Sequence, residues 1–494
     1  MTDNNRQEYA ILALILVLAL ALRLFGLNGP LWFDEIATVD THLRLGWGEM
    51  MQSYSMNHHY LHNLAAKASM QLFGDAPWAI RLPALVFGLL SIAATWALAR
   101  RAAGSISAHA TALLLALSYH HIWFSQNARG YTGMALFSIV GFLLFLRGLD
   151  DRRWQSWLWF AVAMAATIFT HLTGAFFFVT LGLVWLWLVA AAWRAGRLDR
   201  DLLAKPFAGF LIGGLVTIAL YAPLLPSLLS TVHGVAETSA GDPMQEYQNP
   251  LWTAYEAIRT GVGQAGPLVT LIGLGVLALS ALGAVALRRR APLVAPVTFG
   301  HILLTVVLLL GLGMRIWPRF FFTDIALLLL LIVCGVQLVC AGLARLTGPA
   351  LGRWLFPLAL AGMVLVSAAM AARNYIAPKQ DLAGAYDFAE AHRKPGERVY
   401  TIAYAGDIYR THFQADWGAI FTEDDYRAAI QAPGALTIVV VFPDRTFRSL
   451  PSLDADLKAG RLQLETRLPG TLGDGDILIL HRDAGADATG GTGG

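Results

Sequence analysis

Charged residues are scarce in this chain. Asp, Glu, Lys and Arg make up 14% of its 494 residues, and 56% of the residues are hydrophobic, whereas a soluble globular protein carries roughly 25% charged residues. The apolar residues fall in blocks long enough to cross a bilayer, which takes about 20 residues. The composition therefore excludes an ordinary soluble protein and predicts an α-helical polytopic membrane protein.

Cysteine and metal-binding patterns are also rare. The chain has two cysteines, Cys334 and Cys340, six positions apart in one apolar segment. On a helix they are separated by a rise of roughly 9 Å, too far for a local disulfide. No HExxH or Cys-based metal pattern is present, so we assign no metal ligands. We expect no required cofactor and keep a divalent cation as an alternative.

Eleven apolar blocks are expected to be transmembrane helices. They cover residues 9–27, 83–99, 106–122, 132–147, 156–170, 174–193, 207–224, 266–287, 293–312, 320–344 and 354–372. A basic cluster follows each even-numbered block, as in the Arg288–Arg290 run. Because cytoplasmic loops are enriched in Lys and Arg, these connections should face the cytoplasm. We therefore expect a protein of the cytoplasmic (inner) membrane, with a cytoplasmic N-terminus and an extracytoplasmic C-terminus.

Two parts of the chain lie outside this pattern. The loop 28–82 falls on the predicted outer face, and long loops without clear structure are usually functional. Beyond residue 373, "DLAGAYDFAEAHRKPGERVYTIA", "GALTIVVVF" and "GDILILHR" read as a helix and strands. We expect a transmembrane domain at 1–373 including loop 28–82, a small extracytoplasmic α/β domain at 374–483, and a disordered tail at 484–494.

The stretch "GPLWFDEIATVD" (29–40) places Asp34 and Glu35 directly after the first apolar block. Adjacent carboxylates in an apolar and aromatic frame repel each other and are costly to desolvate. A wet surface loop explains them equally well on local sequence. A carboxylate beside a hydrophobic wall can also have its pKa raised toward the range of a general base. We therefore take both residues as catalytic candidates.

Three arginines lie in short loops of the predicted outer face, where the positive-inside rule disfavours them. Arg129 is in "SQNARGY", and Arg315 and Arg319 are in "GMRIWPRFFF". Such arginines can anchor a helix at the interface by snorkelling, or hold a phosphate with the guanidinium fork. Together with Lys67 and the neighbouring Tyr131, they are candidates for binding an anionic substrate.

Histidines form a further group of candidates. His58 and His62 are four positions apart, on one face of a helix if that segment is helical, with His59 between them. Such a pair can bind zinc, but without a specific pattern we favour hydrogen bonding to substrate or a structural role. His171, in "THLTG", is expected to face the same cavity. We list His58, His59 and His171 as substrate-binding candidates.

The combined pattern resembles the integral-membrane glycosyltransferases of the GT-C class, in particular bacterial proteins similar to protein O-mannosyltransferases and the lipid A aminoarabinose transferase. The stretches that carry the resemblance are "GPLWFDEIATV", "NHHYLHNLAAKASMQLFGDAPWAIRLPALVFGLL", "HIWFSQNARGY", "THLTG" and "RIWPRFFF". It covers roughly residues 8–345. The chain departs from the family at 58–62, where relatives often have "HPPLY", and at Phe320, where they commonly have tyrosine.

The resemblance implies an enzyme that takes a sugar from a polyprenyl-phosphate carrier and passes it to a hydroxyl group, with inversion at the anomeric carbon. It implies that Asp34 is the base, with Glu35 beside it, and that Arg129 and Arg319 lie near the donor phosphate. Lys67 occupies a similar lysine position. The expected partners are the polyprenyl-phosphate sugar, an acceptor lipid, polysaccharide or protein, and membrane lipids; we expect no nucleic acid.

A multi-pass transporter or flippase for lipids or lipid-linked sugars is the main alternative, because it would also need intramembrane charges and cavities. The notable charges, however, are predicted on one face rather than near the midplane. A ligand-binding sensor is a third interpretation. It would place its site in residues 374–494, where the sequence shows no phosphate loop, metal spacing or nucleophile motif.

Overall fold

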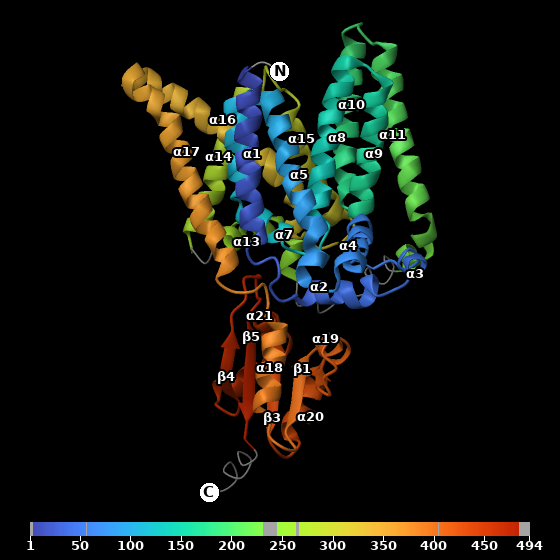
Figure 1. The fold of residues 1–494 in the computed structure, drawn as a ribbon, viewed down its shortest axis with the longest axis vertical. Coiled ribbons are helices and arrows are strands. Elements are labelled where there is room, and N and C mark those ends of the chain that lie inside the picture. The colour runs from blue at the N-terminus through green and yellow to red at the C-terminus, as the bar shows by residue number, and fades with distance from the viewer. Residues whose placement is uncertain (1–2, 56, 231–244, 263–265, 404, 484–494) are drawn as a thin grey trace. The chain divides into compact units, whose positions relative to one another are not determined.

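The computed structural model (Figure 1) describes residues 3–55, 57–230, 245–262, 266–403 and 405–483. These residues form two compact units. The first unit contains the chain up to Leu27 and from Trp47 to Ala372, and the second contains Asn28–Gly46 and the chain from Arg373 onward. The tail predicted to be disordered, 484–494, lies outside the described residues.

The first unit is built from long apolar helices. Among the described residues, nine helices are long and apolar enough to cross a membrane, which makes the chain a multi-pass membrane protein. They are α1 (Asp3–Leu24), α5 (Pro77–Ala103), α8 (Tyr131–Asp151), α10 (Gly174–Arg194), α11 (Arg200–Tyr221), α14 (Leu268–Leu287), α15 (Val294–Gly311), α16 (Phe322–Thr347) and α17 (Pro349–Ala372).

The other two predicted spans coincide with shorter helices, α6 (Ser105–Ala116) and α9 (Trp154–Thr170). The block predicted at 106–122 is interrupted, because Ser118 begins a new helix, α7 (Tyr119–Ser125). The Ser118 hydroxyl accepts a hydrogen bond from the backbone N–H of His121, as an N-cap residue does. This break ends α6 early and turns the chain toward the loop that carries Arg129.

Close helix contacts in this unit depend on small residues. A Cβ atom on Gly283 of α14 would lie 1.9 Å from the Leu331 carbonyl oxygen of α16, and one on Gly335 would lie 2.1 Å from the Leu279 carbonyl oxygen. The two backbones therefore touch at these positions, as membrane helices do where small residues face each other.

Short elements join the long helices and carry much of the loop sequence. These elements are α3 (Trp47–Met50), α4 (Tyr60–Phe73), η2 (Ala222–Leu224), η3 (Gln245–Gln248), α13 (Pro250–Val262) and η4 (Pro318–Phe321). Helix α4 buries Tyr60, His62, Asn63 and Lys67 along its length. The polar side chains of His62, Asn63 and Lys67 are thus buried, although they belong to a predicted outer loop.

The second unit contains a five-stranded sheet with strand order β2-β1-β3-β5-β4. Its strands are β1 (Arg398–Ile402), β2 (Gly418–Ile420), β3 (Leu436–Val441), β4 (Gln463–Leu468) and β5 (Ile477–Arg482). Strand β1 pairs in parallel with β2 and β3, and β5 pairs antiparallel with β3 and β4. The predicted small α/β domain is confirmed, with "TIVVV" as its central strand.

Helices cover both faces of this sheet. They are α18 (Leu382–His392), α19 (Ala405–Thr411), α20 (Glu423–Gln431), α21 (Pro443–Ser449) and α22 (Pro451–Lys458), of which the first four are labelled in Figure 1. The short helix η5 (Arg373–Tyr375) precedes α18 in the chain. All six residues of β3 are buried. Val439 packs in one core with Leu382, and Ile438 packs in the other with Tyr426, because successive side chains of a strand point to opposite faces.

Residues 28–46 form part of this second unit rather than of the helical one. They contain α2 (Phe33–Thr38) and the π-helical turn η1 (Val39–Leu43). Ile36 is buried in the core that also contains Leu382 and Trp417. The sequence places the whole loop 28–82 in the transmembrane domain, because the apolar residues of a loop do not reveal which surface they cover.

Candidate active site

Arg129 lies in a short loop that is hydrogen-bonded to the backbone at the end of α1. The loop, 126–130, joins α7 to α8. The Gln126 side-chain amide donates hydrogen bonds to the backbone carbonyls of Arg23 (3.0 Å) and Phe25 (2.5 Å). The Arg129 guanidinium is 2% exposed and donates to the backbone carbonyl of Asn57 (3.1 Å) and to the Asn57 side-chain oxygen. Arg129 is therefore buried in a fixed position.

His59 lies beside this arginine in a group of rings. Its ring centroid is 4.9 Å from that of Tyr131 and 4.7 Å from that of His171, and the residue is 1% exposed. A Cβ atom on Gly130 would lie 3.0 Å from His59 Nδ1 and 2.7 Å from the Thr170 methyl carbon. The glycine after Arg129 thus provides the space that His59 occupies.

Arg319 completes the group from another part of the chain. It lies on η4, with its guanidinium 4.7 Å from the centroid of the Trp317 ring. The next residue, Phe320, has its ring centroid 5.7 Å from that of His171. Five of the predicted residues are therefore brought together: His59, Arg129, Tyr131, His171 and Arg319. We call them the phosphate cluster, after the ligand that the sequence predicts for the arginines.

The positive charge of the phosphate cluster is carried by its arginines. Burial, and next the Arg129 guanidinium, lower the pKa of His59 well below its ordinary value. Burial, Arg129 and Arg319 lower the pKa of His171 to about 3. Both imidazoles are neutral near pH 7, so the cluster offers two guanidinium charges with neutral rings between them. Such a group of donors suits an anion.

The remaining predicted binding residues have contacts of their own. His58 stacks on Tyr60 with ring centroids 3.7 Å apart, and its Nδ1 lies 2.9 Å from the Asn63 amide nitrogen. Lys67 is buried, with its ammonium 5.4 Å from the centroid of the Trp47 ring. Arg315 is half-buried in the loop before η4. Among the described residues, no group of three or more His, Cys, Asp or Glu side chains could hold a metal ion.

The acidic pair occupies the first turn of α2, in the second unit. Glu35 is fully buried, and its Oε2 accepts a hydrogen bond from the Trp32 backbone N–H at 3.3 Å, which is half of a capping box. Asp34 is half-buried, and its backbone carbonyl accepts from the Thr38 hydroxyl at 2.8 Å. The two carboxylates thus differ in local role, because the Glu35 side chain closes the start of the helix.

Helix α2 is fixed to the sheet domain by three kinds of contact. Ile36 is buried in the core of that domain. The Phe33 and Phe442 rings meet edge to face with centroids 5.6 Å apart. Asp40, on η1 directly after α2, lies 3.2 Å from His412. The acidic segment is therefore carried by the C-terminal domain.

Two buried polar pairs in the helical unit were not predicted. Arg23 of α1 lies with its Nη2 2.7 Å from His121 Nδ1, and its Nε donates to the Ser125 hydroxyl at 3.1 Å. His301 Nδ1 lies 2.9 Å from both carboxylate oxygens of Asp324. Each pair contains an ionisable residue within an apolar block of the sequence. Such residues are rare in membrane helices and usually pair with another polar group, so the sequence alone indicates that a partner exists.

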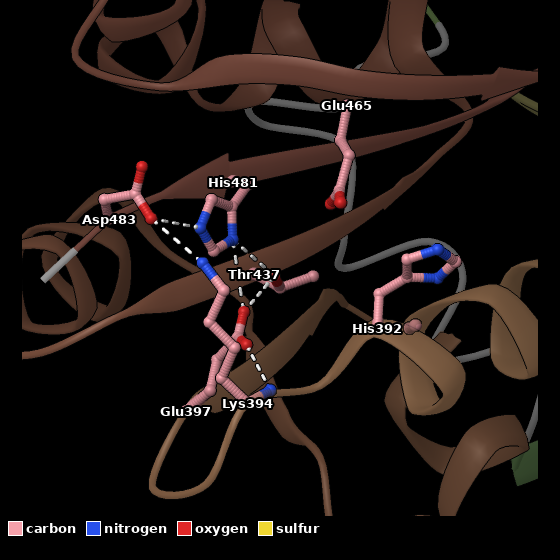
Figure 2. A pocket seen from close by; sticks show the side chains of 8 residues that line it. His392, Lys394, Glu397, Thr437, Glu465, His481 and Asp483 are labelled. Atoms are coloured by element: carbon pink, nitrogen blue, oxygen red, sulfur yellow. Dashed lines mark hydrogen bonds and ion pairs between the residues drawn. The ribbon is translucent and has the colours of Figure 1, made fainter.

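A polar pocket in the second unit was also missed (Figure 2). It is lined by Ala389, His392, Lys394, Glu397, Thr437, Glu465, His481 and Asp483. His481 lies 3.2 Å from Glu397 through Nδ1 and 3.2 Å from Asp483 through Nε2. Lys394 pairs with Asp483 at 3.1 Å. Charged groups in this pocket thus pair with one another, and none of the predicted site residues lies in it.

Comparisons with known proteins agree with this architecture. Residues 57–226 match the family described as dolichyl-phosphate-mannose-protein mannosyltransferase. ArnT from Cupriavidus metallidurans, solved with undecaprenyl phosphate, superimposes with a TM-score of 0.52 at 16% identity, over 98% of this chain and 99% of ArnT. The chain has the GT-C fold. This confirms the resemblance predicted from the sequence.

A second GT-C structure extends the likeness to archaea. The oligosaccharyltransferase AglB from Archaeoglobus fulgidus, solved with an inhibitory peptide and a dolichol-phosphate, superimposes with a TM-score of 0.54 at 12% identity. The match covers 93% of this chain and 72% of AglB. A comparison with curated protein sequences gives no match. At such low identities the GT-C likeness establishes the fold alone.

Proposed function

We propose that this protein is an inverting glycosyltransferase that moves a sugar from a polyprenyl-phosphate donor to an acceptor hydroxyl at the outer face of the cytoplasmic membrane. The observation that carries the proposal is the phosphate cluster, in which the buried Arg129, the half-buried Arg319 and neutral rings form a donor-rich site. ArnT and AglB were solved with polyprenyl-type phosphates, which supports the same class of ligand here. The C-terminal domain is then extracytoplasmic and the N-terminus cytoplasmic.

In this mechanism Arg129 and Arg319 hold the donor phosphate. The bond between the anomeric carbon and the phosphate oxygen breaks, and the bonding electrons go to the phosphate, whose negative charge increases. Fixed guanidinium groups in a buried site stabilise that developing charge without reorganising. The polyprenyl chain stays in the bilayer, so no soluble carrier is released.

Asp34 is assigned as the base that takes the proton from the acceptor hydroxyl while the new carbon–oxygen bond forms. Proton transfer by a positioned carboxylate typically contributes 10²- to 10⁴-fold to a rate. Glu35 is assigned a supporting role, because its carboxylate accepts the Trp32 N–H and closes the first turn of α2. The bound acceptor is a lipid, a polysaccharide or a protein with a free hydroxyl.

A flippase for lipid-linked sugars is the second candidate. It is favoured by the buried His301–Asp324 pair, which joins α15 to α16, because transporters use paired intramembrane charges. The phosphate cluster suits both candidates, but only a transferase needs a base.

The test is to offer the purified protein in lipid vesicles a panel of polyprenyl-phosphate sugars and an acceptor mixture. Transfer or slow hydrolysis of one donor, with release of polyprenyl phosphate, supports the transferase. Movement of an intact donor across the bilayer without cleavage supports the flippase instead. Arg129→Ala should weaken either activity, so Asp34→Asn is the variant that separates the two candidates.

A further inference from the structure

The His59 ring has an unusual position within the phosphate cluster. The residue is buried, and neither Nδ1 nor Nε2 has a hydrogen-bond partner among the residues that the structure describes. Leaving a buried polar atom unpaired costs about 1–3 kcal/mol. A buried ring with both nitrogens unpaired, beside two arginines, is arranged to gain a partner when a ligand arrives.

The groups around His59 come from several elements. Its electrostatic neighbours are Arg129, His171, His62 and Arg319, and Tyr131 lies against its ring. None of these neighbours is acidic. A proton on His59 is therefore opposed by two positive charges until an anion enters the cluster.

His171 differs from His59 because a neighbouring residue determines which of its two ring nitrogens carries the proton. The Thr173 backbone N–H donates to His171 Nδ1 at 3.3 Å, and the Thr173 hydroxyl lies 2.7 Å from the same atom. Because Nδ1 accepts, the ring proton of neutral His171 is on Nε2. His171 can donate to an anion without changing its charge, which leaves His59 as the ring free to take up a proton.

We propose that His59 binds a proton when the phosphate group of the lipid carrier enters the cluster, so that binding of the carrier is coupled to proton uptake. The proposal rests on the proposed function, since it assigns the anion to the lipid phosphate. The incoming anion offsets the two guanidinium charges and gives the imidazolium an acceptor. By linkage, affinity for the phosphate rises as pH falls, by up to about tenfold per pH unit.

The experiment uses a ligand that does not titrate. A prenyl methyl phosphodiester has no second ionisation near neutral pH, so any proton taken up belongs to the protein. Calorimetry of its binding to the full-length protein in detergent micelles, in buffers with different ionisation enthalpies, counts the protons. Dimethyl phosphate in place of the lipid separates recognition of a free phosphate diester from recognition of a lipid headgroup.

Two variants assign the proton. His59→Gln should bind the diester without proton uptake and with a weaker pH dependence. His109→Gln is the matched control, because His109 lies on α6 with its Nε2 3.1 Å from the Glu8 carbonyl oxygen, outside the cluster. The control should keep the uptake of the unaltered protein. Proton uptake is measured first on the unaltered protein, so absence of uptake there overturns the proposal even if the His59 variant fails to fold.

The outcomes are distinct. Uptake that His59→Gln removes and His109→Gln keeps supports the proposal. Binding that needs Arg129 but takes up no proton, or uptake that persists in His59→Gln, overturns it while leaving the transferase standing. Uptake with dimethyl phosphate as well as the lipid diester supports the same coupling and shows that the prenyl chain is not needed. Failure of the unaltered protein to bind the lipid diester removes the proposed donor site, and the proton-coupling proposal with it.

Discussion

Both carboxylate oxygens of Asp40 lie 3.2 Å from Nδ1 of His412, 372 positions further along the chain. This pair ties the segment that carries Asp34 and Glu35 to the C-terminal domain. Ile36 and Phe33 reinforce the link through the domain core and through Phe442. The domain thus acts as a platform for the acidic helix, a role that its sheet motifs do not suggest.

Loss of this pair should affect turnover more than binding of the donor. His412→Asn removes the imidazole that contacts Asp40 and lets α2 move, so kcat should fall roughly tenfold. This is less than the 10²-fold loss that a misplacement of about 1 Å can cause. KM for the donor should stay within about a factor of two. His392→Asn is the control, because His392 is an exposed residue of the same domain that stacks on Phe388. Equal losses in both variants would contradict a positioning role.

The two adjacent acids should differ in importance. Asp34→Asn should reduce transfer by about 10²- to 10⁴-fold, because the variant cannot accept the acceptor proton. Glu35→Gln should stay within about tenfold of the unaltered protein, since glutamine also closes a capping box. Initial rates of sugar transfer measure both. The reverse order would move the base to Glu35 and contradict the role given to its hydrogen bond with Trp32.

The fork of Arg129 should matter as well as its charge. Arg129→Lys keeps the charge but loses the planar donors, so binding of a prenyl phosphodiester should weaken by about 2 kcal/mol, roughly 30-fold. Arg147→Lys, at an exposed arginine paired with Asp151, is the matched control. Calorimetric dissociation constants decide; equal affinity in the Arg129 variant and its control would place the phosphate elsewhere.

Gly130 should be needed because of the space it leaves. The Cβ of Gly130→Ala would meet Thr170 and His59, so the ring must shift, and overpacking of this kind costs about 1–3 kcal/mol. Affinity for the phosphodiester should fall together with thermal stability. Gly214→Ala is the control, since a Cβ there meets no atom within 4 Å. Unchanged affinity in Gly130→Ala would show that the position of His59 does not matter for binding.

Asp474 should make the stability of the second unit depend on pH. It accepts backbone hydrogen bonds from Asp444 (2.8 Å) and Arg445 (3.2 Å) at the start of α21, yet burial raises the pKa of its carboxyl to about 6. A raised pKa in the folded state means that this group's contribution is fully present below about pH 4 and is lost as pH rises toward 6. Raising the pKa from about 4 to about 6 corresponds to a loss on the order of 3 kcal/mol.

This dependence can be isolated by difference. Unfolding of the second unit by urea can be followed by the fluorescence of Trp417, obtained by subtracting the signal of a Trp417→Phe variant. The unfolding curve gives the free energy of unfolding of this unit at each pH. Asp474→Asn should flatten the curve between pH 4 and 6 relative to the unaltered protein. An identical slope in both proteins would show that Asp474 does not carry the effect.

Much of the fold was predictable because it follows from composition. Nine of the eleven predicted spans correspond to described helices long and apolar enough to cross a membrane. Of the other two, 156–170 corresponds to the shorter α9 and 106–122 is divided between α6 and α7. The strands "TIVVV" and "ILILHR" lie in the sheet. The sequence could not show that Ser118 would end one helix and begin another, since a serine within an apolar block is common. It also could not show that Ile36 packs in one core with Leu382 and Trp417. An apolar residue in a loop is expected to be buried, but the sequence does not indicate which distant residues cover it.

The candidate site was predictable in part. Arg129 with Tyr131, His171, and Arg319 come from three stretches far apart in the sequence, and the structure brings them together with His59. His58 and Lys67 had the same sequence signals but pack against Tyr60 and Trp47. Residue type and spacing identify candidates, whereas the direction of each side chain depends on packing that only the fold determines.

The most direct test of the central claim is the amount and stereochemistry of sugar transferred from a polyprenyl-phosphate donor by the reconstituted protein. We predict a product with the anomeric configuration opposite to that of the donor and one polyprenyl phosphate released per sugar. Transfer by Asp34→Asn should be reduced by about 10²- to 10⁴-fold. Retention of configuration, or undiminished transfer by Asp34→Asn, would contradict it.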